Sequence, residues 1–84
     1  MSDDITELQA FETIARFVHN EGQNCIMDGN PCPDIVSVLA MVERLSRRRG
    51  YDSPVIAALV DDLDTHNTEC IQTLREYGDH DHGY

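Results

Sequence analysis

The chain has 84 residues, which is enough for one folded domain. A core of that size hides about 60% of the surface that the unfolded chain would expose, so oligomerisation is expected to help stability. Sixteen acidic residues stand against six arginines and no lysine, and the formal net charge is −10. Such a charge repels nucleic acid and anionic membranes and attracts basic protein surfaces, so we expect no direct binding of nucleic acid or membrane.

The compartment follows from the apolar runs and the first residues. No run approaches the roughly 20 apolar residues of a membrane span, and the segment Met1 to Asp4 is acidic and unlike a signal peptide. We therefore expect a cytoplasmic protein, or one that acts in a host cytoplasm. Arginine at every basic position is typical of GC-rich coding and points to a bacterium or a phage.

The first helix is expected over about residues 4–21. Asp4 and Glu7 have the spacing of a capping box. Gly22 is expected to end the helix in the left-handed conformation. His19 near that end is interpreted as a favourable C-terminal cation. One buried face is indicated by apolar residues that recur at spacings of three and four: Ile5, Leu8, Phe11, Ile14, Ala15 and Val18.

A loop is expected over residues 22–32. Asp28 and Gly29 form a turn signal, and the nearby prolines Pro31 and Pro33 do not suit a helix interior. Ile26 and Met27 are apolar side chains in this polar stretch. They either fold back over the core as a lid or contact a partner protein.

The second helix is expected over about residues 33–49, with Pro33 in its first turn and Gly50 at its end. The triplet Arg47 to Arg49 suits the negative end of the helix dipole, although a contact with phosphate is an alternative. The apolar stripe is wide enough for two neighbouring helices. The residues expected in it are Ile35, Val38, Leu39, Val42 and Leu45, with Val36 and Met41 on the flanks.

The third helix is the longest, over about residues 53–77, with Ser53 as N-cap and Pro54 at the first position. Gly78 is expected to end it, and residues 79–84 are expected to fray. One set of mostly apolar positions is spaced alternately by four and three residues, which is typical of a seam between helices. They are Ile56, Val60, Leu63, Asn67, Cys70, Leu74 and Tyr77.

Asn67 is the polar member of this seam. Two such amides can satisfy each other across a two-fold axis, and they fix register at a cost in stability. We therefore expect a homodimer with Leu63, Asn67, Cys70, Leu74 and Tyr77 at the contact, in which Asn67→Leu raises stability. The alternative is that Asn67 faces water on an ordinary amphipathic helix.

Two groups of residues invite a chemical interpretation. Cys25, Cys32, His66 and Cys70 could provide four zinc ligands, but six residues separate Cys25 from Cys32, where zinc pairs usually have two to four. We expect no metal and no cofactor, and keep a zinc-binding regulatory module as an alternative. The acidic cluster Asp52, Asp61, Asp62 and Asp64 is expected to be a solvated face. Because short helices offer little volume for a catalytic pocket, we expect no enzyme.

These observations together predict an all-α fold, a three-helix bundle with a long C-terminal helix. The expected function is an acidic inhibitor or adaptor that binds a basic surface of a partner protein, through Asp52, Asp61, Asp62 and Asp64 or through Ile26 and Met27. In size, charge and absence of a motif, the chain resembles the small inhibitors that phages encode, including anti-CRISPR proteins. If the basic surface of the partner normally holds nucleic acid, the chain would act as a charge mimic of phosphate. A small subunit of a larger complex is a further alternative.

Overall fold

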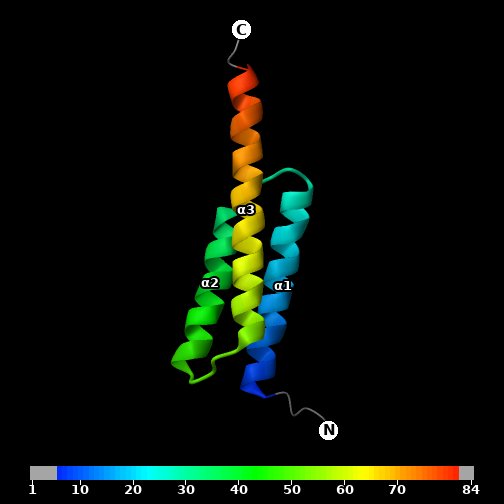
Figure 1. Cartoon of the computed structure of the whole chain (residues 1–84). Helices are drawn as coiled ribbons and strands as arrows, with labels where there is room; N and C mark the ends of the chain where they lie inside the picture. Colours follow the sequence, from blue (N-terminus) through cyan, green and yellow to red (C-terminus); the bar gives the residue numbers. More distant parts are fainter. Residues whose placement is uncertain (1–5, 82–84) are drawn as a thin grey trace.

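The computed structural model describes residues 6–81, with side chains up to residue 76. It contains three helices, α1 (Glu7–Met27), α2 (Pro33–Arg48) and α3 (Pro54–Asp81), and the residues described include no strand. Each helix packs against the other two, and α2 runs antiparallel to α1 and α3 (Figure 1). The predicted all-α three-helix bundle with a long C-terminal helix is thus confirmed. None of the helices described is long and apolar enough to cross a membrane.

The N-terminus of α1 is capped two residues later than predicted. Thr6 accepts a hydrogen bond from the backbone N–H of Gln9, and the Gln9 side chain accepts one from the backbone N–H of Thr6. This is a capping box, which satisfies two of the open donors at a helix start. Glu7 is therefore not the capping-box partner that was predicted. Asp4, the other predicted member of that pair, lies outside the residues described.

Gly22 does not end α1, contrary to prediction, and lies buried inside a helix that continues to Met27. A Cβ atom at this position would lie 2.7 Å from Leu63 Cδ1 and 3.2 Å from Ile35 Cγ2. Glycine is needed here for the close approach of three helices, since it has no side chain. The predicted loop 22–32 is accordingly reduced to residues 28–32, where Gly29 has a φ of 83°.

The connection between α2 and α3 follows the sequence prediction. Pro33 lies at the start of α2, and Gly50, with a φ of 90°, follows its end. Ser53 accepts a hydrogen bond from the N–H of Ile56 and so caps α3. This connection is also fixed to α1, because Arg49 and Tyr51 both donate to Glu7. The loop thereby holds the lower end of the bundle together.

The helix α3 extends to Asp81, past the predicted end at Gly78. Its last turns project beyond the other two helices (Figure 1). The molecule is consequently elongated, with extents of 63 × 24 × 16 Å. The fraying expected for residues 79–84 is contradicted for residues 79–81, whose backbone is helical, and the rest lies outside the residues described.

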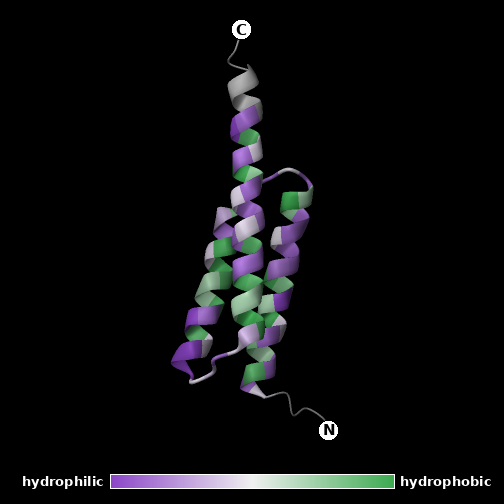
Figure 2. Cartoon of the chain, viewed as in Figure 1, coloured by the Kyte–Doolittle hydropathy of each residue, from purple (hydrophilic) through white to green (hydrophobic). Residues whose placement is uncertain are grey.

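The core is small and runs along the axis of the bundle. Its fully buried members are Ala15, Leu39, Ile56 and Leu63. Hydrophobic and hydrophilic residues alternate along all three helices, as in amphipathic helices (Figure 2). The predicted stripes are nevertheless too wide, because Ile14, Val38, Met41 and Leu45 are each more than 40% exposed. A bundle of three helices covers only the centre of each stripe.

The close packing at Gly22 can be tested with a larger side chain. Gly22→Leu is expected to destabilise the protein by about 1–3 kcal/mol, because overpacking forces Leu63 and Ile35 to move. The gain in helix propensity of about 1 kcal/mol opposes this loss without removing it. The measurement is urea unfolding, with Asn20→Leu, at an exposed position of the same helix, as control. A variant as stable as the control would contradict the packing described.

Candidate functional site

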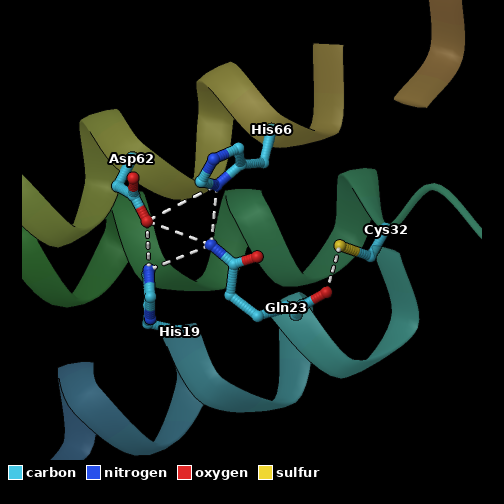
Figure 3. A network of polar contacts seen from close by, with 6 residues as sticks. His19, Gln23, Cys32, Asp62 and His66 are labelled. Atoms are coloured by element: carbon cyan, nitrogen blue, oxygen red, sulfur yellow. Dashed lines mark hydrogen bonds and ion pairs between the residues drawn. The ribbon is translucent and has the colours of Figure 1, made fainter. Parts of the chain in front are cut away.

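A polar network joins the middle of α1 to the middle of α3 (Figure 3). His19 Nε2 lies 2.7 Å from Asp62 Oδ2. Gln23 Nε2 donates to the same Asp62 oxygen at 3.0 Å and lies 2.7 Å from His66 Nδ1. His66 Nδ1 itself is 3.5 Å from Asp62 Oδ2. One carboxylate oxygen is thus held by two side chains of α1 and one side chain of its own helix.

The electrostatics of the network favour a charged Asp62. The hydrogen bond with His19 is the main cause that holds the pKa of Asp62 below its ordinary value, and the charges of His66 and His19 act in the same direction. Since these side chains are partly exposed, the network is a solvated clamp between helices and no buried catalytic group. The prediction of His19 as a cation at a helix end is wrong, because α1 continues for two more turns.

The lowered pKa of Asp62 makes its contribution to stability depend on pH. A carboxyl whose pKa is lower in the folded state stabilises the protein above the unfolded pKa of about 4, and this contribution disappears as the pH falls through the folded pKa. Asp62→Asn should therefore reduce the unfolding free energy at pH 5–7 and have little effect near pH 2. Urea unfolding of both proteins across this range measures the difference. A difference that grows on acidification would contradict the assignment.

Asn67 lies inside the chain and contacts α2. It is buried, and its Oδ1 accepts a hydrogen bond of 2.7 Å from the backbone N–H of Cys32, at the start of α2. Cys32 makes no side-chain cap of its own. Asn67 thus supplies from α3 the acceptor that a helix N-terminus needs.

The expected dimer seam is contradicted at its centre. Leu63 is fully buried in the core, and Asn67 is buried and accepts its hydrogen bond from Cys32 of the same chain. Cys70 is half-buried and Leu74 is 44% exposed, whereas the Tyr77 side chain lies outside the part described. From Ile56 to Asn67 the heptad spacing therefore marks the inward face of α3, whereas a contact between chains at Cys70, Leu74 and Tyr77 stays a prediction.

The new role of Asn67 reverses the expected effect of its replacement. Asn67→Leu should destabilise the protein by about 1–3 kcal/mol, because the buried N–H of Cys32 loses its acceptor. Thr68→Leu, at the exposed neighbouring position, serves as control for the added leucine. Thermal unfolding monitored by circular dichroism gives the comparison. A rise in melting temperature for Asn67→Leu would restore the seam interpretation.

The cysteines and His66 do not form a zinc site. Among the residues that the structure describes, no three His, Cys, Asp or Glu side chains are grouped to hold a metal ion. Cys25, Cys32 and Cys70 are free thiols, and the Cys32 thiol contacts the carbonyl of Gly22. Burial raises the pKa of Cys32, which keeps it protonated and unreactive. The suggested ligand set of Cys25, Cys32, His66 and Cys70 is therefore not assembled.

Ile26 and Met27 lie in the last turn of α1, whereas the sequence predicts a loop there. Ile26 packs against the core and so fits the lid interpretation, whereas Met27 is 81% exposed. An open pocket of about 260 Å³ lies beside Ile26, between this end of α1 and the upper part of α3. His66, Cys70 and Leu74 line its α3 side.

The predicted acidic cluster is divided by the structure. Asp52, Asp61 and Asp64 are exposed, and none of the ion pairs within residues 6–76 involves them. Asp62 lies on another side of α3 and is engaged by His19 and Gln23. Asp61 and Asp64 are therefore exposed and make no ion pair within residues 6–76, whereas Asp62, although also exposed, is engaged by α1.

A set of exposed apolar side chains, the α1/α2 apolar surface, was only partly visible in the sequence. Its members are Ile14, Phe17, Val38, Met41 and Leu45, exposed by 43–66%. Phe17 is the residue that the sequence pattern missed. The signal that could have found it is its spacing of three residues from Ile14 on the flank of the α1 stripe.

On α1 this surface lies on the flank away from α3. Ile14 directly precedes the buried Ala15, and successive residues turn by about 100° around a helix. His19 and Gln23 directly follow Val18 and Gly22, on the opposite flank, where they contact Asp62 of α3. The flank with Ile14 and Phe17 therefore faces α2.

On α2 the exposed apolar residues likewise precede buried or half-buried ones. Val38, Met41 and Leu45 come directly before Leu39, Val42 and Ser46. The two helices of an antiparallel pair are related by a two-fold rotation. Because this rotation carries each flank of one helix onto the same flank of the other, equivalent flanks lie side by side. The contact of Gly22 with Ile35 sets Phe17 level with residues 38–41 and Ile14 level with residues 41–45. The five side chains thus form one continuous surface.

Comparisons of this chain with protein-family models, with curated proteins and with solved structures gave no match. What the chain does is therefore inferred from its own surfaces.

Proposed function

We propose that this chain is a non-enzymatic interaction module that binds a basic surface of a partner protein. The observation that carries the proposal is the excess of exposed acidic side chains. Asp61 and Asp64 project from α3, and none of the ion pairs within residues 6–76 involves them. With a net charge of −10, such side chains supply long-range attraction for a basic partner.

Apolar side chains at the end of α1 support the same function. Met27 is the most exposed of the large apolar side chains described, and Ile26 lines the neighbouring pocket. Exposed methionines suit surfaces that adapt to a partner. Asp61 and Asp64 would guide the encounter, and Met27 would contribute contact area.

The finer form of the proposal is an inhibitor or adaptor. If the basic surface of the partner normally holds nucleic acid, carboxylates spaced along α3 would compete with phosphate groups for the same arginines and lysines. This is the action expected of a phage-encoded or anti-CRISPR-like protein in a bacterial cytoplasm. The projecting end of α3 favours a second candidate, a subunit whose last turns are covered in a larger complex.

The test is capture of a partner followed by charge reversal. The wild-type chain serves as bait in an extract of the source cells, and the captured protein is identified by mass spectrometry and purified. Asp61→Lys/Asp64→Lys should weaken binding at least tenfold, and raising the salt concentration should weaken the wild-type complex steeply.

The matched control is Glu69→Lys/Glu76→Lys, which changes the net charge equally at exposed positions further along α3. This control should retain most of the affinity. Equal losses in both variants would mean that only net charge matters, and binding insensitive to salt would contradict the acidic face as the contact.

A further inference from the structure

We propose that the α1/α2 apolar surface is an interface between two copies of this chain, paired antiparallel about a two-fold axis close to Met41. This inference does not depend on the proposed function, which concerns α3 and the last turn of α1. It replaces the seam on α3 by another face of the molecule.

The amount of exposed surface is the first observation. The chain exposes 5969 Å², whereas a compact monomer of its mass exposes about 5,000 Å². Part of the difference belongs to the projecting turns of α3 (Figure 1). The chain thus exposes more surface than a compact monomer of its mass, and a standard interface would cover approximately 800 Å² of each partner. Five large apolar side chains provide the centre of such an interface.

The order of residues along α2 is the second observation. Asp34, Val38, Met41, Leu45 and Arg48 are spaced by four, three, four and three residues, which is the spacing of a helix–helix seam. Asp34 and Arg48 are both exposed and lie seven residues on either side of Met41. The seam therefore has an apolar centre, an acidic end and a basic end, symmetrically placed.

This symmetry selects one orientation of the second copy. If the two α2 helices cross antiparallel at Met41, Asp34 of each copy lies opposite Arg48 of the other, and two ion pairs form. If the copies were paired with like ends together, Asp34 would meet Asp34 and Arg48 would meet Arg48. On α1 the same axis places Ile14 opposite Phe17 of the second copy and the small Ala10 opposite Glu21.

The net charge does not prevent this pairing. Repulsion between acids of two copies of charge −10 is largely screened where they lie further apart than the Debye length of about 8 Å at physiological salt. The Asp34 to Arg48 pairs would act at contact distance. The result is a four-helix centre in which neighbouring helices are antiparallel, with α3 outermost on each side. Asp61 and Asp64 of both copies would stay accessible to a partner.

The oligomeric state of the full chain is the first test. Sedimentation equilibrium at 1–100 μM should show a dimer for wild type and a monomer for Phe17→Glu and for Met41→Glu. Both positions are exposed, so helicity measured by circular dichroism should not change. Thr65→Glu, at an exposed position of α3, should remain dimeric. A wild-type monomer, or a dimer that survives both variants, would overturn the proposal.

A charge swap tests the orientation. Asp34→Arg and Arg48→Asp should each weaken the dimer roughly tenfold or more, because each creates two like-charge contacts. The double variant should recover most of the wild-type affinity, since its pairs are opposite again. Failure of this recovery would overturn the antiparallel orientation.

Cross-linking provides a second readout near the axis. Met41→Cys should form a disulfide between copies under mild oxidation, in a background with Cys25→Ser and Cys70→Ser. Ser37→Cys in the same background should not. Equal cross-linking of both positions would mean random collision and would count against the axis at Met41.

Discussion

The close approach of three helices at Gly22 is the constraint on which the rest of the structure depends. Leu63 of α3 and Ile35 of α2 both occupy the space that a side chain at this position would take. In a close-packed interior such a contact tolerates little displacement, so it sets the register of all three helices at once. Asn67 then meets the start of α2, and Gln23 meets Asp62 and His66.

The same register explains why polar groups lie beside a small core. Asn67 lies one turn after Leu63 on α3, and its amide meets a backbone N–H that would otherwise be buried without an acceptor. An unsatisfied buried N–H costs about 1–3 kcal/mol, which is a large part of the stability of a domain in which residues 6–76 contribute four fully buried apolar side chains. Asn67 is therefore a structural residue, although its seam position suggested a role between chains.

Much of the fold could be predicted from local signals, because caps and stripes act within a few residues. Pro33, Gly50 and Ser53–Pro54 each determine a helix end through their own backbone chemistry. The prediction that Gly22 ends the helix is wrong because glycine suits both a left-handed helix end and a close approach of helices. Only the positions of Leu63 and Ile35 distinguish the two. The role of Asn67 depends likewise on Cys32, which is 35 residues away.

The exposed surfaces are harder to predict from the sequence than the fold. They depend on which part of the apolar stripe of each helix the other two helices cover. Ile14 and Val38 read as core residues in the sequence, but three helices cannot enclose stripes of that width. The apolar side chains that the bundle leaves exposed on α1 and α2 lie on the side away from α3, while Asp61 and Asp64 extend from α3 itself. The two kinds of force are thereby separated. Apolar contact is short-ranged and suits a permanent neighbour, whereas exposed charge acts over a Debye length and suits an encounter that salt can tune. If the apolar surface and the exposed acids shared one face, contact with one partner would exclude contact with the other. In this molecule the α1/α2 apolar surface and the acids of α3 lie on different faces, so both contacts can form at once.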